Sequence, residues 1–224
     1  MPKGVLYGVS VGPGDPELMT LKAHRIIREA DVIAIPSTGS GAETAYGIAE
    51  HLLCDKEILR CITPMTNDPE TLRAARKQTA DMLCSLLDEG RSVAYLCLGD
   101  IAIYSSYSYL HRIVLDRGYE SCIVPGVSSI SAAAARLGTP LCTGSERLTV
   151  ATMGHDIDDV LDTEGTKVLM KLGKSMKALC ESLRTHEQLD RARMVSRCGL
   201  PGERVYESLE DVEGPGYFSI VIVR

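Results

Sequence analysis

Residues 4–20 read GVLYGVSVGPGDPELMT, an apolar strand-like run that ends in a turn rich in glycine and proline. Glycine lets a backbone turn sharply, and Asp15 followed by Pro16 is a typical helix start, with Asp as the N-cap. A helix-like run follows at 20–30, so the segment predicts strand, loop and helix. By itself the loop is equally consistent with a plain strand-to-helix turn, because it lacks both the GxGxxG spacing and the residues of a phosphate-binding P-loop.

Further along the chain, strand-like and helix-like runs continue to alternate. Such alternation predicts an α/β fold with a mostly parallel sheet covered on both faces. Together with the first strand at 4–11 and the helix at 20–30, the first half contains strands at 31–36, 57–62, 92–98 and 121–126, and helices at 42–53, 68–90, 107–118 and 128–138.

The pattern restarts after Gly138-Thr139-Pro140, which predicts two α/β domains, 1–140 and 141–224. Turn-rich segments such as GLPGE separate the later strands, so the second sheet is expected to be mixed. Two lobes joined by a short linker place the expected site between them. The second half contains strands at 148–153, 167–172, 192–198 and 217–224, and helices at 156–161 and 175–185.

The composition is that of a globular protein, with 45% hydrophobic and 24% charged residues among 224. A net charge of −6 argues against nucleic acid and favours a small-molecule partner. No run is apolar and long enough to cross a bilayer and no signal peptide is evident, so we expect a cytoplasmic protein. Eight cysteines without a CxxC pair are expected to be buried free thiols.

A second loop stands in LCLGDIAIYSSYSYL, residues 96–110, where an apolar strand ends in Gly99-Asp100. Ligands of open α/β sheets bind at the carboxyl ends of strands, so a glycine and a carboxylate here are well placed to meet a polar cofactor. The alternative for Asp100 is a helix N-cap. Three tyrosines follow that either face a ligand or pack in the core: Tyr104, Tyr107 and Tyr109.

A third loop stands in VPGVSSISAAAARLG, residues 124–138. A strand leads into Pro125-Gly126, and Ser128 with Ser129 is expected to cap the following helix. The alanines of that helix permit close approach to a ligand or to a neighbouring sheet.

The order of these motifs resembles the tetrapyrrole (corrin/porphyrin) methylases over the whole chain. The resemblance rests on SVGPGDPELMTLKA at 10–23, GDxxxY at 99–104, PGVSSISAAAARL at 125–137, VLMKLG at 168–173 and YFSIVIV at 217–223. It implies two α/β lobes of the class III S-adenosylmethionine-dependent methyltransferase type, with the active site in the cleft between them. One position departs from the family pattern, because Ile101 stands where the family usually has proline.

The run LGDxxxYSxYxYL at 98–110 is most similar to the branch of the family that methylates C(20) of precorrin-2 or of cobalt-factor II (cobalt-precorrin-2) in vitamin B12 synthesis. The resemblance also implies a homodimer. For S-adenosylmethionine, whose product is S-adenosylhomocysteine, it implies contacts from Pro13, Leu98, Gly99, Asp100, Ile103, Ser128, Ser129, Leu172 and Gly199. It names no catalytic base.

The histidines predict no metal site in the protein, because they show no HxxxH spacing and no cysteine at ligand spacing. A metal is expected to arrive only within the substrate.

Two alternatives to C(20) methylation remain. In the first, the chain is a family member that methylates another corrin position, uroporphyrinogen III or the diphthine precursor. In the second, it is a metabolite-binding protein without catalysis. Turnover in the presence of a tetrapyrrole distinguishes them.

Overall fold

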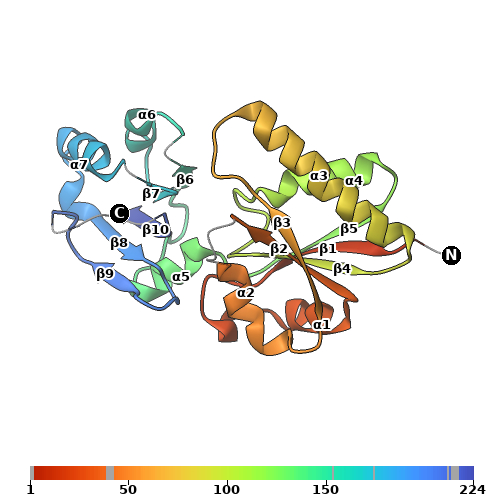
Figure 1. Ribbon diagram of the computed structural model, residues 1–224. Helices are drawn as coiled ribbons and strands as arrows, with labels where there is room; N and C mark the ends of the chain where they lie inside the picture. The colour runs from red at the N-terminus through yellow and green to blue at the C-terminus, as the bar shows by residue number, and fades with distance from the viewer. Residues whose placement is uncertain (1–2, 39–42, 153, 174, 211, 213–216) are drawn as a thin grey trace. The chain divides into compact units, whose positions relative to one another are not determined.

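The computed structural model describes residues 3–38, 43–152, 154–173, 175–210, 212 and 217–224. The chain divides into two compact units, residues 1–128 and 129–224. Each unit contains its own five-stranded sheet with helices packed against it (Figure 1). The two α/β lobes expected from the sequence are therefore present.

The first unit is built on a parallel sheet. Its strands follow the order β3-β2-β4-β1-β5, and every pairing between them is parallel. Strand β1 pairs with both β4 and β5, so the segments that follow these three strands leave the same edge of the sheet side by side. The strands are β1 (Val5–Ser10), β2 (Val32–Ser37), β3 (Glu57–Ile62), β4 (Val93–Cys97) and β5 (Glu120–Val124).

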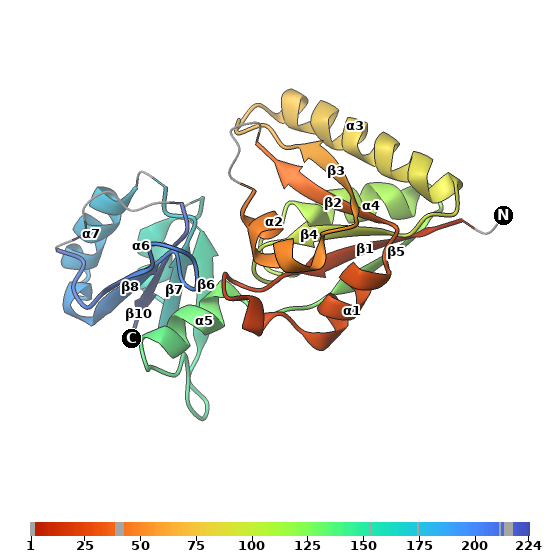
Figure 2. The ribbon, with the colours of Figure 1, turned by 60° about the horizontal axis from the view of Figure 1, so that its bottom comes forward.

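Helices cover both faces of this sheet, as the sequence predicted (Figure 2). Helices α1 (Leu21–Glu29) and α2 (Thr44–Ala49) lie on one face, and α3 (Pro69–Asp88) and α4 (Tyr107–Asp116) lie on the other. Single 3-10 turns occur at η1 (Pro16–Leu18) and η2 (Glu50–Leu52). Alternate strand residues such as Leu6 and Tyr95 pack with Leu83 and Tyr107 beneath α3 and α4.

Gly8 lies in the middle of β1 and admits two large side chains onto the sheet. A Cβ at this position would lie 2.3 Å from Tyr107 Cε1 and 2.6 Å from Ile101 Cδ1. Tyr107 is fully buried and belongs to the core. Of the three tyrosines in the second motif, Tyr104 and Tyr109 are the exposed ones, at 41% and 53%.

The second unit contains the mixed sheet that its turn-rich sequence predicted. The strand order is β6-β7-β10-β8-β9, in which β6 and β7 pair in parallel and the other pairs are antiparallel. Strand β9 was not predicted, because three residues next to the GLPGE turn carry too short a pattern. The strands are β6 (Leu148–Thr152), β7 (Thr166–Met170), β8 (Ala192–Ser196), β9 (Arg204–Tyr206) and β10 (Ser219–Val223).

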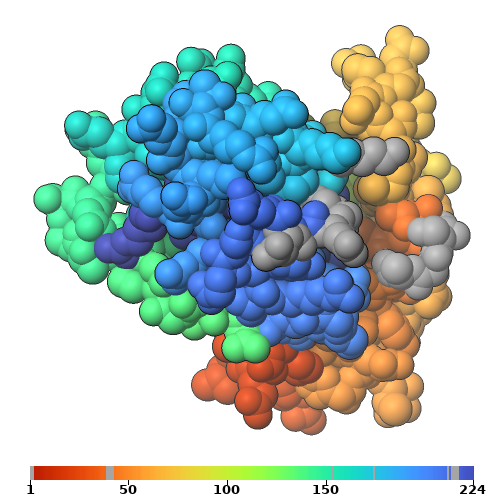
Figure 3. All heavy atoms as spheres, turned by 90° about the vertical axis from the view of Figure 1, so that its left-hand side faces the viewer, coloured from red at the N-terminus to blue at the C-terminus, as the bar shows by residue number. Residues whose placement is uncertain are grey.

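Helices α6 (Ile157–Leu161) and α7 (Met176–Thr185) cover one face of this sheet, and α5 (Ser129–Arg136) covers the other. The 3-10 turn η3 (Leu189–Arg191) leads into β8. The side of the unit that carries α7 faces the viewer in Figure 3.

The division between the units falls earlier than the expected boundary at residue 140. Helix α5 continues the first half in sequence, but it packs on the second sheet. Ile130, Ala133 and Ala134 contact a buried set on that sheet that includes Val168 and Ile222. The small side chains of α5 thus serve close packing on a sheet, one of the two roles that the sequence left open.

All eight cysteines are free thiols, as expected, although their burial differs. Cys61, Cys84, Cys97 and Cys180 are buried, Cys122 and Cys198 are intermediate, and Cys54 and Cys142 are exposed. The prediction of burial was therefore wrong for the exposed pair, which lie outside the strands and helices. Among the described residues, no helix is both long and apolar enough to span a membrane.

Candidate cofactor-binding site

The first loop continues directly from β1 into a tight turn. Gly12 has a φ of 83°, in the left-handed region that favours glycine. The Asp15 side chain accepts a hydrogen bond from the Glu17 amide at 2.9 Å, which confirms Asp15 as an N-cap. The helix that it caps is the single turn η1, and α1 begins separately after Thr20. Asp15 therefore shapes the loop.

The first and second loops are joined through their backbones. The Val11 amide donates to the Cys97 carbonyl at 2.9 Å, and the Gly99 amide donates to the Gly12 carbonyl at 2.7 Å. Gly99 also has a positive φ, of 70°. The contact between β1 and β4 thus extends past both strand ends and brings the two glycine turns together.

Asp100 joins the second loop to the third. Its Oδ1 accepts a hydrogen bond from the Ala102 amide at 2.7 Å, and its Oδ2 accepts one from the Gly126 amide at 2.8 Å. Helix α4 begins later, with Ser106 as its N-cap residue, so the alternative of Asp100 as a helix cap is wrong. Each carboxylate oxygen has a further lone pair, so Asp100 still has acceptor capacity for a ligand.

Ser10, the last residue of β1, is a part of this arrangement that the sequence analysis missed. Its side chain is fully buried. The hydroxyl donates to the Val124 carbonyl at 2.8 Å and accepts from the Ile101 amide at 2.9 Å. The available signal was a polar residue within an apolar strand run, which becomes informative only when its partners are known.

Gly126 completes the contact between the loops. A Cβ at this position would lie 2.4 Å from Ser10 Cβ and 3.1 Å from the Gly99 carbonyl oxygen. The glycine therefore allows the third loop to pack directly against the end of β1 and against the second loop. Three segments distant in sequence form one small backbone cluster at the carboxyl edge of the sheet, the usual ligand edge of such sheets.

The first unit brings most of the predicted contact residues to this edge. Pro13 and Gly99 are buried, Leu98 and Asp100 are half-buried, and Ile103 is 37% exposed. Tyr104 follows with a φ of 48°, an uncommon conformation for a side chain of its size. Ser128 is half-buried at the end of the unit, and Ser129 is the first residue of α5 in the second unit.

Two predicted residues lie at one edge of the second sheet. Strands β7 and β8 both pair antiparallel to β10, so they run in the same direction, and Leu172 and Gly199 follow their carboxyl ends. Leu172 is 1% exposed within the core under α6 and α7. Gly199 is exposed, has a φ of 72°, and donates its amide to Glu203 at 2.7 Å.

The backbone before each of these residues is unusual. Lys171 and Arg197 have φ values of 57° and 54°, in the left-handed region that side chains rarely adopt. Burial lowers the pKa of the Lys171 ammonium. Backbone of this kind clusters at binding sites, which supports this edge as a second candidate region for ligand contacts.

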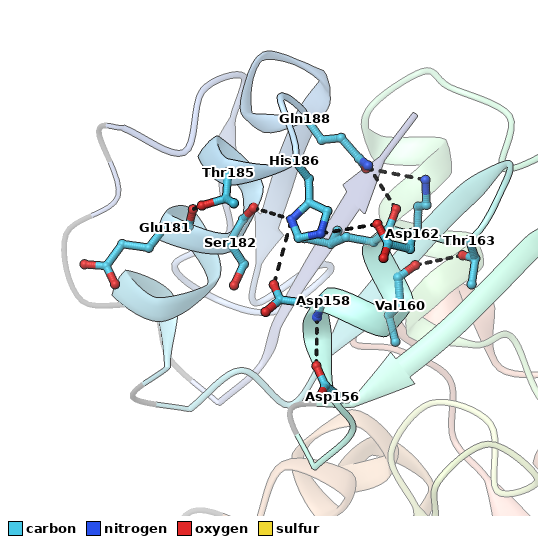
Figure 4. Close-up of polar contacts among 12 residues, drawn as sticks. Asp156, Asp158, Val160, Asp162, Thr163, Glu181, Ser182, Thr185, His186 and Gln188 are labelled. Atoms are coloured by element: carbon cyan, nitrogen blue, oxygen red, sulfur yellow. Dashed lines mark hydrogen bonds and ion pairs between the residues drawn. The ribbon is translucent and has the colours of Figure 1, made fainter.

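A separate polar cluster surrounds His186 in the second unit (Figure 4). His186 Nδ1 donates to the Ser182 carbonyl at 2.8 Å, and its Nε2 lies 3.4 Å from an Asp162 carboxylate oxygen. Gln188 donates to the Leu161 carbonyl at 2.9 Å. These contacts connect the end of α7 to α6. Within the described ranges, no group of three or more His, Cys, Asp and Glu side chains is arranged to hold a metal ion.

A sequence profile of the tetrapyrrole (corrin/porphyrin) methylases matches residues 5–213, which span both units. The chain belongs to this family. The cobalamin biosynthesis protein CobIJ of Mycobacterium tuberculosis (strain ATCC 25618 / H37Rv) is 37% identical to this tetrapyrrole methylase over 234 residues, covering 99% of the chain and 46% of CobIJ. The chain thus spans about half the length of that relative.

Other relatives match over nearly their full length. The cobalt-precorrin-2 C(20)-methyltransferase of Salmonella typhimurium is 31% identical over 230 residues, covering 99% of the methylase chain and 96% of the relative. Among solved structures, a uroporphyrin-III-C-methyltransferase from Thermus thermophilus is 30% identical with a TM-score of 0.71, covering 98% and 91% of the two chains. A uroporphyrin-III C-methyl transferase from Thermus thermophilus solved with S-adenyl homocysteine shares the fold, at 22% identity and a TM-score of 0.76, covering 99% and 98%.

Proposed function

We propose that this chain transfers a methyl group from S-adenosylmethionine to the C(20) carbon of precorrin-2 or cobalt-factor II (cobalt-precorrin-2), a step of cobalamin biosynthesis. The observation that carries the proposal is the similarity to the Salmonella typhimurium relative over 99% of this chain and 96% of the other. A match that runs through both units supports the same activity more strongly than a match to one motif or one sheet.

The edge of the first sheet fits S-adenosylmethionine. Binding sites for small molecules and cofactors combine apolar surface with a few precisely placed polar groups. Leu98 and Ile103 present apolar side chains that are half-buried and 37% exposed, on either side of the Asp100 carboxylate in sequence. We assign Asp100 a bond to a hydroxyl or ammonium group of the cofactor, and Pro13 and Gly99 backbone contacts. Ser128 extends this set.

The cofactor supplies a methyl group already activated by a sulfonium. The residues of this chain therefore have to bind and orient the reactants, and orientation alone contributes about 7–11 kcal/mol in well-positioned pairs. The hydrogen bonds among the three loops serve this purpose, because they hold Asp100 and the backbone of Gly99 in a fixed arrangement before ligand binds. Such preorganisation reduces the entropy that binding must remove.

The second unit is proposed to contribute Ser129, Leu172 and Gly199. Leu172 is buried in its own core, so the contact assigned to it is through its backbone. We also propose a homodimer and a cytoplasmic location. The homodimer is what the family resemblance implies, and the location is the one expected in the sequence analysis.

The test is a methyl-transfer assay with labelled S-adenosylmethionine and, in separate reactions, metal-free precorrin-2, its cobalt form and uroporphyrinogen III. The third substrate is included because the 30% identical Thermus thermophilus structure is named a uroporphyrin-III-C-methyltransferase. We expect product from a precorrin-2 form and none from uroporphyrinogen III, with methylation at C(20) established by mass spectrometry and NMR. Transfer to uroporphyrinogen III alone would reassign the substrate. Cofactor binding without transfer to any of the three would favour a metabolite-binding protein.

A further inference from the structure

The buried Ser10 side chain makes hydrogen bonds that reach the ends of two neighbouring strands at the proposed site. Strand β1 lies between β4 and β5 in the sheet, and Ser10 is its last residue. The hydroxyl contacts residue 101 beyond β4 and residue 124 at the end of β5, and both contacts are buried.

The bond to Val124 fixes the orientation of the hydroxyl. A carbonyl oxygen can only accept, so the Ser10 proton points to Val124 at 2.8 Å. The lone pairs of Ser10 are then left for the Ile101 amide, which donates at 2.9 Å. One hydroxyl therefore satisfies a donor on one side and an acceptor on the other, and it sets the spacing between two loops.

Ile101 occupies a turn position that suits proline. The Ile103 amide donates to the Asp100 carbonyl at 3.3 Å, which makes residue 101 the first central position of a β-turn that begins at Asp100. Proline is favoured at such positions and has no amide hydrogen. Isoleucine at this position introduces an N–H group in a residue that is only 2% exposed, and a buried donor without an acceptor is strongly unfavourable.

The Ser10 hydroxyl oxygen is the acceptor that the buried Ile101 amide requires. Proline would hold the second loop by its ring, whereas here the loop is held by a hydrogen bond to the neighbouring strand. Gly126 packs against Ser10 from the third loop, where an added Cβ would lie 2.4 Å from Ser10 Cβ. Any displacement of Ser10 is therefore transmitted to both loops.

We propose that Ser10 is a positioning residue for the methyl donor, coupled specifically to Ile101. Through the Ile101 amide it holds the segment that carries Gly99 and Asp100 in the geometry that binds the cofactor, and it makes no contact with the reacting atoms. The inference rests on the proposed function, because it concerns the same binding edge.

The test is a double-mutant cycle with Ser10→Ala, Ile101→Pro and the double variant. Each protein is measured for its affinity for S-adenosylhomocysteine by calorimetry, for KM and kcat with S-adenosylmethionine, and for its Tm without ligand. We expect Ser10→Ala to weaken binding about tenfold and to raise KM with little change in kcat, because a group that acts on cofactor placement affects binding first. On the Ile101→Pro background, the same change is expected to weaken binding by no more than about twofold, since the donor is gone.

Thr79→Val is the matched control. Thr79 is a buried hydroxyl residue of α3, 4% exposed and in a different segment from the three loops, and valine keeps its shape. We expect this variant to bind S-adenosylhomocysteine as the wild type does. If Ser10→Ala does not fold, two measurements still test the coupling. One is the Ser10→Thr variant, which keeps the hydroxyl. The other is the comparison of Ile101→Pro with the double variant.

Two results would overturn the inference. One is a lower Tm for Ser10→Ala with unchanged affinity and KM, which would make Ser10 a purely structural residue. The other is an equal loss of affinity on both backgrounds, which would mean that Ile101 is not its partner. Failure of the proposed function is distinguishable, because it shows in the wild type as no binding or no methyl transfer, before any variant is compared.

Discussion

The carboxylate of Asp100 accepts a hydrogen bond from the Gly126 amide at 2.8 Å, 26 residues further along the chain. Its other oxygen accepts from Ala102 at 2.7 Å. A residue that the sequence suggested as a direct cofactor contact is therefore also the tie between two loops. Loss of its side chain is expected to affect both the fold of the edge and the binding of ligand.

For this reason we predict that Asp100→Ala weakens binding of S-adenosylhomocysteine at least tenfold and lowers the free energy of unfolding by about 2 kcal/mol, a usual value for lost hydrogen bonds to a charged group. Calorimetry and chemical denaturation measure the two effects. Asp68→Ala is the control, because Asp68 likewise accepts from a backbone amide, at Thr71, but caps α3 at an exposed position. The control is expected to lose stability without losing affinity. Wild-type affinity in Asp100→Ala would remove Asp100 from the site.

Gly126→Ala tests the packing of the third loop. The new Cβ would lie 2.4 Å from Ser10 Cβ, so the loop has to move, and overpacking of this kind costs about 1–3 kcal/mol. We expect a lower Tm together with weaker S-adenosylhomocysteine binding. Gly47→Ala is the matched control, since a Cβ there meets nothing within 4 Å and the residue lies in α2. If both alanine variants behave alike, the close contact at Gly126 has no functional consequence.

Reactivity of the cysteines is expected to follow their burial. Burial raises the pKa of the Cys61 and Cys97 thiols to about 12. At pH 8 only about one such thiol in 10⁴ is ionised, and the thiolate is the reactive form. Iodoacetamide labelling followed by mass spectrometry should modify the exposed Cys54 and Cys142 first and leave Cys61 and Cys97 unmodified until the protein is unfolded. Rapid labelling of either buried thiol in the native protein would contradict the packing of the first sheet.

The sequence predicted the elements of the first unit well, because its strands and helices carry clear periodicities and most of them are followed by glycine or proline. The glycine turns at Gly12, Gly99 and Gly126 were recognisable for the same reason. A buried hydrogen bond carries no such pattern. Ser10 reads as one polar residue in an apolar strand, and its role depends on two partners more than 90 residues away in sequence.

Packing partners were equally hidden. Helix α5 has the alanine-rich pattern expected from its sequence, but periodicity shows that a helix has an apolar face without showing which sheet covers it. Its residues Ile130 and Ala133 pack on the second sheet, which moves the division between the units to residues 128 and 129. Leu172 is a similar case, because its place in the family motif suggested a ligand contact while its side chain is part of the core.

We predict that the stability of the loop that contains Gly199 depends on pH, because the Glu203 carboxylate holds that loop. The Glu203 carboxylate accepts from the Gly199 amide at 2.7 Å and pairs with Arg136 of α5. The hydrogen bond from Gly199 and then the Arg136 guanidinium hold the pKa of Glu203 below its usual value of 4.5. A depressed carboxylate pKa means that the stabilisation is fully present above the pKa of the unfolded chain and is lost as the pH falls through the folded value.

Glu203→Gln removes the charge while keeping an oxygen that can accept from Gly199. We therefore expect it to lower the free energy of unfolding at pH 7 by about 1 kcal/mol or less, since Arg136 is largely exposed, and to match the wild type once the pH is well below 4.5. Thermal unfolding of both proteins between pH 7 and pH 3 measures the difference. Glu207→Gln is the control, because Glu207 pairs with Arg193 but is 70% exposed, and it should show little effect at any pH. A difference between Glu203→Gln and the wild type that persists unchanged into acid would show that the amide geometry, and not the charge, holds this loop.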